Sequence, residues 1–197
     1  MAMTDGAAFF ETAIGLCGIV WNPRGIAGVQ LPERDERATR SRLLRRFPEA
    51  SEDAPPEPVR QAIDGIRGLL SGEAADLTPV TLDLERMPPF HQRVYVVARG
   101  ITAGSTLSYG EIAERLGDKS LARDVGQAIG ENPWPIIVPC HRVLAANGNV
   151  GGFSAAGGVT TKLRLLNIEH AQPGEAPTLF GDLPLHARPQ RRGAGRR

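Results

Sequence analysis

The chain changes character at the segment RMPPF, residues 86–90, and this break constrains the fold more than any other feature of the sequence. The β-rich runs that precede it give way to a series of short helical patterns. We therefore expect a small α/β unit over residues 1–85 and a mostly α-helical domain over residues 86–171. Residues 172–197 contain prolines and glycines and end in RPQRRGAGRR, which predicts a basic, disordered tail.

The α/β unit is expected to contain a hairpin, two helices and a further strand. β-rich residues on both sides of the NPRG segment, residues 22–25, predict the hairpin. Apolar residues recur at helical spacing in residues 33–47 and 59–72, and the proline-rich residues 48–58 separate these helices as a linker. Residues 80–84, VTLDL, alternate as a strand does.

Two short helices in the second unit form a helix-turn-helix pattern. Ser108 and Glu111 have the spacing of a capping box, and the second helix is expected over residues 121–130. The outer face of the second helix carries one cation and mostly small residues: Arg123, Gly126, Gln127 and Gly130. The minor groove of B-form DNA is only ~6 Å wide, so a nearly bare helix suits it. The same glycines could equally pack against a neighbouring helix.

Composition excludes several functional classes. The formal net charge is +1, so nucleic-acid binding would require a local surface. No apolar run approaches ~18 residues, which predicts no membrane span, and the first residues lack the pattern of a secretory signal. Two cysteines cannot make a disulfide framework, so we expect a cytoplasmic protein in which Cys140 is a free thiol.

Cys140 and His141 stand side by side at the end of an apolar, proline-punctuated run. With a pKa of ~8.5, a free cysteine is only slightly ionised at neutral pH and needs a base, which a third group must orient. A backbone turn at Pro139 would bring the imidazole to the sulfur, and Glu169 in the last helix could orient it. The alternative is that Cys140 is a small buried hydrophobe, which is the expected state of Cys17. The histidine and cysteine spacing predicts no metal site.

The segment PCHRV, residues 139–143, resembles the active-site signature of the O6-alkylguanine-DNA alkyltransferases, also called methylated-DNA–protein-cysteine methyltransferases. SYGEIA at residues 108–113 and NPWPIIVPCHRV at residues 132–143 stand in the order found in that family, and a GG…K-RLL-IE pattern follows them. The resemblance covers residues 88–169 strongly and the N-terminal unit loosely.

The resemblance implies a role for each matching residue. Cys140 matches the alkyl acceptor, His141 the base that takes the thiol proton through a water, and Glu169 the acid behind the base. Asn132 matches the asparagine that braces the active-site turn. Tyr109 matches the tyrosine that crowds the 3′ phosphate, helps to rotate the nucleotide and donates to the base.

Further positions match residues that contact DNA in the family. Arg123 matches the arginine that fills the hole left in the duplex, and Gly126 lies on the helix that would enter the minor groove. Val143 and Ser154 lie where the family contacts the extruded guanine. Lys162 matches a lysine that supports the site.

The implied activity is DNA repair by stoichiometric transfer of the alkyl group of O6-alkylguanine to Cys140, with O4-alkylthymine left open. A stacked base hides its O6 substituent, so the base must be flipped out of the duplex. Nothing in the chain suggests a group that removes the product thioether, so we expect one turnover per molecule. The expected partner is alkylated double-stranded DNA, bound through the minor groove by a monomer, without cofactor, membrane or obligate protein partner.

Two rival functions remain open at the level of sequence. One is a relative that binds alkylated DNA without chemistry, although in such proteins the reactive cysteine is replaced. The other is a cysteine hydrolase, which would need an oxyanion hole and an asparagine or aspartate behind the histidine.

The arginines from Arg188 to Arg197 leave two interpretations open. They would add non-specific affinity for DNA phosphates, or they would only make a disordered tail more soluble.

Three features depart from the family pattern. Phe153 stands where many members have tyrosine, Trp134 stands where smaller apolar residues are common, and the loop GGFSAAGGVTTK is longer than in the best-known members. The departures put the contacts of Phe153 and the assignments of Ser154 and Lys162 in doubt, but they leave Cys140 and its neighbours unchanged.

Overall fold

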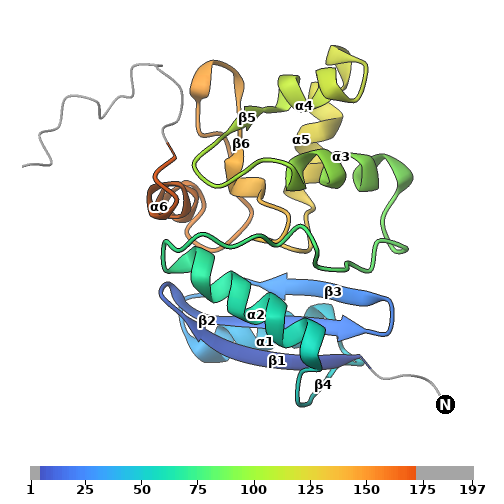
Figure 1. The fold of residues 1–197 in the computed structure, drawn as a ribbon, viewed down its shortest axis with the longest axis vertical. Coiled ribbons are helices and arrows are strands. Elements are labelled where there is room, and N and C mark those ends of the chain that lie inside the picture. The colour runs from blue at the N-terminus through green and yellow to red at the C-terminus, as the bar shows by residue number, and fades with distance from the viewer. Residues whose placement is uncertain (1–4, 172–197) are drawn as a thin grey trace, which may run out of the picture.

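The computed structural model describes residues 5–171 of the chain. A four-stranded sheet and two helices form one layer, and the remaining helices form a second layer packed above it (Figure 1). The sheet has the order β3-β2-β1-β4. Its strands are β1 (Gly6–Thr12), β2 (Gly15–Asn22), β3 (Gly25–Gln30) and β4 (Ser51–Glu52). Strands β1, β2 and β3 are antiparallel neighbours, and β4 pairs with β1 in parallel.

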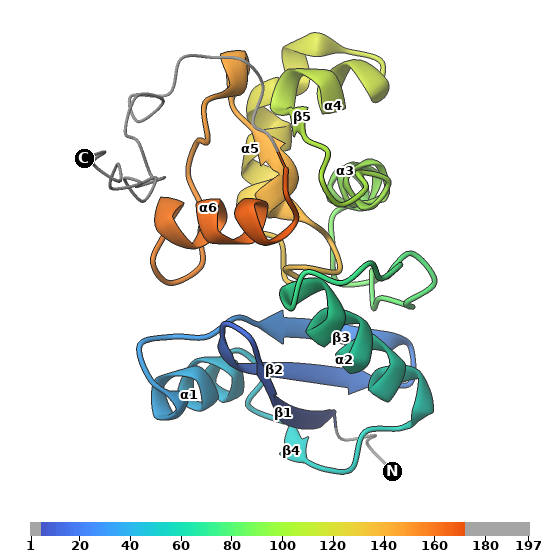
Figure 2. The same cartoon turned by 60° about the vertical axis from the view of Figure 1, so that its left-hand side comes forward.

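Helices α1 (Glu36–Arg46) and α2 (Glu57–Leu70) cover opposite faces of this sheet (Figure 2). Successive strand residues point to opposite faces, so neighbours on β3 enter different cores. Ala27 packs in a cluster with Leu43 and Phe47 on the side of α1. Ile26 packs with residues of α2 in a larger cluster that continues into the second layer.

The second layer contains short elements that carry most of the residues singled out by sequence. The helices are α3 (Pro89–Arg99), α4 (Tyr109–Arg115), α5 (Ala122–Gly130) and α6 (Val159–Ile168). Strands β5 (Leu107–Ser108) and β6 (Val143–Leu144) pair in parallel. Single 3₁₀ turns are η1 (Lys119–Leu121), η2 (Cys140–Arg142) and η3 (Ala146–Gly148). The expected α/β arrangement followed by a mainly helical arrangement is therefore present.

Local sequence signals predicted most of these elements. The hairpin at residues 22–25 joins β2 and β3, and both helices of the first layer lie within three residues of their expected starts and two of their expected ends. The capping box is confirmed. Ser108 Oγ accepts a hydrogen bond from the Glu111 amide at 3.1 Å, and the Glu111 carboxylate accepts one from the Ser108 amide. The predicted tail at residues 172–197 lies outside the described residues.

Strand assignments differ from expectation in several places, including β4, which lies in the segment predicted to be a linker. Strand β1, whose sequence is GAAFFET, was not predicted because it does not alternate cleanly between apolar and polar residues. The strand expected at residues 80–84 is wrong: only Leu82 forms an isolated bridge, with Ile26. The rest of the β3 edge is already occupied, since the Val29 amide donates to the carbonyl of Pro133 at 2.8 Å.

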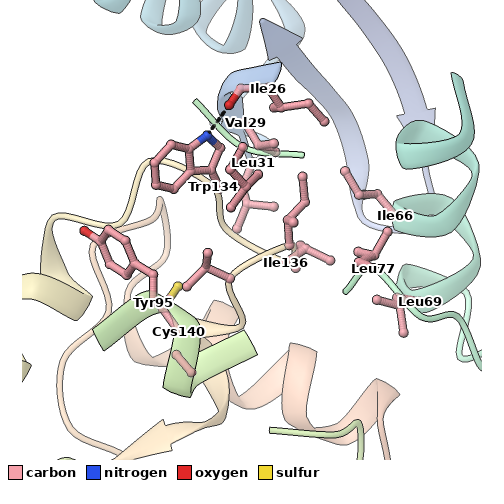
Figure 3. Packing of buried hydrophobic residues seen from close by; sticks show 14 of the residues in the cluster. Ile26, Val29, Leu31, Ile66, Leu69, Leu77, Tyr95, Trp134, Ile136 and Cys140 are labelled. Carbon is pink, nitrogen blue, oxygen red and sulfur yellow. Dashed lines mark hydrogen bonds between the residues drawn. The ribbon is translucent and has the colours of Figure 1, made fainter. Parts of the chain in front are cut away.

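Trp134 joins the second layer to the sheet through a hydrogen bond and ring packing (Figure 3). Its indole nitrogen donates to the carbonyl oxygen of Ile26 at 2.7 Å, and its ring meets that of Tyr95 edge-on at 5.7 Å. The side chain is buried. The bulky residue that departs from the family pattern therefore packs under the active-site turn and joins it to β3.

Replacing Trp134 should destabilise the whole fold. We expect Trp134→Ala to lower the free energy of unfolding by about 3–5 kcal/mol through lost packing. Trp134→Phe should cost less, about 1 kcal/mol, because chiefly the indole hydrogen bond is lost. Urea unfolding measures both values, and the exposed Val96→Ala is the control, expected within about 0.5 kcal/mol of wild type. A Trp134→Ala protein as stable as this control would contradict the docking role.

Candidate active site

The turn before Cys140 is held by the side chain of Asn132. Its amide nitrogen donates to the carbonyl of Val138 at 2.8 Å, and its oxygen accepts from the Trp134 amide at 3.0 Å. Prolines within the turn supply no backbone donors, so a side chain takes over this bracing. Ile136 has a positive φ of 75°, a conformation that is costly for a β-branched residue and persists only where the surroundings impose it. The bracing expected of Asn132 is present in the geometry.

Cys140 begins the 3₁₀ turn η2 and is only 5% exposed. Burial raises the pKa of its thiol, while the side chain of Asn132 and the charge of Lys162 act in the opposite direction. The thiol is therefore protonated at neutral pH. A protein that uses this sulfur as a nucleophile needs a base beside it.

His141, Arg142 and Glu169 form one buried, charged cluster. The His141 Nε2 atom lies 2.9 Å from Oε1 of Glu169. The guanidinium of Arg142 donates to both oxygens of the same carboxylate, at 2.7 and 2.8 Å, and also to the carbonyl of Ile101. Glu169 lies at the C-terminal end of α6, so this cluster ties the last helix to the turn that carries Cys140.

The charges in this cluster set the protonation of the histidine. Burial alone would raise the pKa of Glu169, but hydrogen bonds from His141 and Arg142 outweigh it and lower this pKa to about 2. Burial lowers the pKa of His141, against the opposing effect of Glu169. A neutral imidazole that donates from Nε2 to the carboxylate carries its lone pair on Nδ1. Within residues 5–171, Nδ1 makes no hydrogen bond, so it is the atom that can accept a proton.

Lys162 is completely buried and bonds to backbone carbonyls on both sides of the site. Its Nζ atom donates to the carbonyl oxygens of Val143 at 2.6 Å and Val150 at 2.5 Å. Burial lowers the pKa of Lys162 to about 8, although the nearby Cys140 favours its charged form. This lysine joins β6 to the loop before α6 and places a positive charge near the sulfur.

A pocket of about 300 Å³ opens beside Cys140, between α5 and the loop before α6. Its lining residues are Tyr109, Gly126, Ile129, Gly130, Cys140, Gly152, Phe153 and Ser154. Burial raises the pKa of Tyr109, and a negative charge on Cys140 would raise it further, so the phenol keeps its proton and is a donor. Cys140, Tyr109, Gly126 and Ser154 are thus brought together as expected.

Arg123 and Val143, which were expected to contact DNA, do not line the pocket beside Cys140. Arg123 is exposed in the first turn of α5, outside the residues that line this pocket. The side chain of Val143 is completely buried in β6, and its carbonyl oxygen is bonded to Lys162. The side chain of Val143 is therefore not exposed to the pocket, and its carbonyl oxygen retains one lone pair.

Arg142 is the site residue that sequence reasoning missed. It lies inside PCHRV, but its partners Glu169 and Ile101 are distant in the chain. Only its position two residues after the cysteine could have drawn attention to it.

Other chemistries find little support in the part of the chain that the structure describes. No group of three histidine, cysteine or carboxylate side chains among residues 5–171 could hold a metal ion. The same residues contain no helix of the length and apolarity needed to cross a bilayer. Cys17 is buried in β2, and burial raises the pKa of its thiol to about 12, which makes it an unreactive core residue.

The structure places a buried thiol, a histidine and a carboxylate bonded to that histidine beside an open pocket, and comparison with known proteins places the chain in a family. Residues 89–171 match the family model described as 6-O-methylguanine DNA methyltransferase, DNA binding domain. A methylated-DNA–protein-cysteine methyltransferase of Methanothermobacter thermautotrophicus is 34% identical over 152 residues, which make up 77% of this chain and 78% of the relative. The protein of that name from Mycobacterium tuberculosis is 43% identical over 119 residues, 60% of this chain and 70% of the relative.

A solved structure agrees with these matches. The crystal structure of Mycobacterium tuberculosis OGT in complex with DNA aligns with a TM-score of 0.67 at 32% identity, over 84% of this chain and 92% of that one. The chain belongs to the methylated-DNA–protein-cysteine methyltransferase family.

The lowered pKa of Glu169 predicts a dependence of stability on pH. Its ordinary value is 4.5 and its value in the folded protein is about 2. The carboxylate therefore stabilises the fold above pH 4.5, and this contribution is lost as the pH falls toward about 2. We expect the loss to be on the order of 3 kcal/mol in wild type and absent in Glu169→Gln.

Urea unfolding between about pH 6 and pH 2 measures this difference. The exposed Glu49→Gln is the matched control and should follow the wild-type curve. Parallel curves for wild type and Glu169→Gln would contradict the buried ion cluster.

Proposed function

We propose that this protein repairs DNA by transferring the alkyl group of O6-alkylguanine to Cys140. The observation that carries the proposal is the placement of Cys140: it forms part of the pocket wall, and the His141–Glu169–Arg142 cluster lies directly after it in η2 and at the end of α6. The names of the relatives support the same activity.

The reaction begins with removal of the thiol proton. His141 takes it at Nδ1, through the water that the family resemblance implies, while Nε2–H stays bonded to Glu169. Arg142 keeps that carboxylate ionised, so the carboxylate stabilises the imidazolium that forms. The thiolate then attacks the alkyl carbon, the carbon–O6 bond breaks, and its electron pair stays on the guanine.

Tyr109 assists the departure of guanine. Its protonated hydroxyl lines the pocket and donates to the base as negative charge develops there. The product is a thioether on Cys140. No residue of the site offers chemistry to cleave this bond, so each molecule acts once.

The α4–η1–α5 segment is proposed to bind DNA as a helix-turn-helix, with α5 in the minor groove. Apart from chain neighbours and the backbone of α5 itself, no atom of residues 5–171 lies within 4 Å of where a Cβ would stand at Gly130, and at Gly126 only Tyr109 comes that close, at 3.9 Å. Gly130 therefore leaves its part of the α5 surface bare, whereas Gly126 faces the ring of Tyr109 at the start of α4. Arg123, exposed at the start of α5, would fill the gap that the extruded nucleotide leaves.

In this scheme residues 86–171 bind DNA and carry the chemistry, residues 1–85 support them, and the protein acts as a monomer. The sensor function is disfavoured because the cysteine is present. A hydrolase is disfavoured because the acid behind the histidine is Glu169 rather than an asparagine or aspartate.

The stoichiometry of transfer tests the proposal. Increasing amounts of duplex DNA with O6-[³H]methylguanine are incubated with a fixed amount of protein, and the label bound to protein is counted. We expect it to reach a plateau at one methyl group per molecule, because the thioether is permanent. Cys140→Ser should acquire no label and still bind the duplex. Demethylation beyond the molar amount of protein, or binding without transfer by wild type, would refute the proposal.

A further inference from the structure

Cys140 also borders a second, smaller pocket of about 60 Å³ on the side that faces the N-terminal layer. Three residues, Cys140, Phe153 and Ser154, line both this pocket and the larger one. Ala155 of the loop before α6 also lines it, and the other lining residues come from β3 and its end, from α1 and from the active-site turn: Val29, Gln30, Leu31, Arg42, Arg46, Asn132 and Pro135. The N-terminal layer thus contributes side chains to a space next to the reactive sulfur.

The two arginines of this pocket lie one turn apart on α1. Arg46 donates to the carbonyls of Val29, at 3.4 Å, and Pro133, at 3.2 Å, so its guanidinium lies at the rim formed by β3 and the active-site turn. Arg42 lies 3.2 Å from Glu33, whose carboxylate also accepts from Gln30. Glu33 therefore pairs with Arg42, whereas within residues 5–171 Arg46 bonds only to backbone carbonyls and has no carboxylate at ion-pair distance.

The positive charge of Arg42 affects the pKa of Arg46. Burial lowers the pKa of its guanidinium, and the positive charge of Arg42 lowers it further. An anion placed between these two groups would relieve their repulsion and form charge-assisted hydrogen bonds.

The stereochemistry of the transfer indicates which part of a substrate the smaller pocket could hold. Sulfur, the attacked carbon and O6 must lie in line, so any further atoms on that carbon project sideways, beside the sulfur. A methyl group needs no additional space there, whereas a longer adduct needs a cavity that adjoins both Cys140 and the base pocket. The smaller pocket meets this requirement through its shared wall of Phe153 and Ser154.

Building on the proposed function, we propose that this pocket receives the tail of O6 adducts that end in a carboxylate, and that Arg42 and Arg46 recognise it. For an O6-carboxymethyl adduct, the Cys140 sulfur bonds to the methylene carbon and the bond from that carbon to O6 breaks. Its electron pair remains with guanine, which receives the proton removed from the thiol. The products are S-carboxymethylcysteine and unmodified guanine.

Three otherwise identical duplexes test this proposal, with O6-methylguanine, O6-carboxymethylguanine or the neutral, nearly isosteric O6-carbamoylmethylguanine. The second-order rate constant of transfer is measured for each by mass spectrometry of the protein. We expect wild type to react with the carboxymethyl adduct about tenfold faster than with the carbamoylmethyl adduct, because only the former makes charge-assisted bonds. A change in general DNA affinity cancels in this ratio.

Arg42→Gln and Arg46→Gln should each lower the ratio severalfold toward one, and Arg42→Gln, which removes no bond to the active-site turn, should leave the methyl rate within about twofold. Arg40→Gln is the matched control: Arg40 belongs to the same helix but pairs with Glu52 at 2.7 Å, and it is not among the residues lining the pocket. A wild-type ratio near one, or a ratio unchanged in both variants, would overturn the proposal while methyl transfer continues. Absence of transfer from all three duplexes would instead refute the proposed function itself.

Discussion

The site depends on one buried carboxylate shared by two partners. Glu169 accepts from His141 and, through both oxygens, from Arg142, in a region where all three side chains are nearly inaccessible. A buried charge is costly unless it is paired and hydrogen-bonded. The cluster meets this condition only when the end of α6, which carries Glu169, packs against the turn η2, which carries His141 and Arg142. The same contacts that fix the fold here also fix the tautomer and orientation of the imidazole.

A second constraint comes from the sheet. The edge of β3 would expose unpaired backbone groups, and the active-site turn covers it through Pro133 and Trp134. The N-terminal layer is therefore part of the support of the catalytic turn, and through Arg42 and Arg46 it reaches the wall of a pocket that Cys140 lines. Sequence changes in this layer can affect the site without altering any residue of the PCHRV segment.

Features that depend on neighbouring residues could be predicted from sequence. Helical spacing predicted α1 and α2, the Ser108–Glu111 pair predicted the start of α4, and the Cys140–His141 pair indicated the nucleophile and its base. The bidentate role of Arg142 was not predicted, because no local pattern indicates that an arginine joins the expected His141–Glu169 pair. The strand predicted at residues 80–84 reduces to a bridge at Ile26, and no local pattern indicates that Pro133 and Trp134 bond to the same edge of β3.

The central claim is that the sulfur of Cys140 becomes the acceptor because the buried cluster removes its proton. The most direct measurement is peptide mapping by mass spectrometry after wild type and His141→Ala have been mixed with O6-methylguanine duplex for the same short time. The account predicts one methyl group on the wild-type peptide that contains Cys140, none on the peptide that contains Cys17, and at least about a hundredfold slower modification in His141→Ala. A methyl group on another residue, or equal rates in the two proteins, would contradict it.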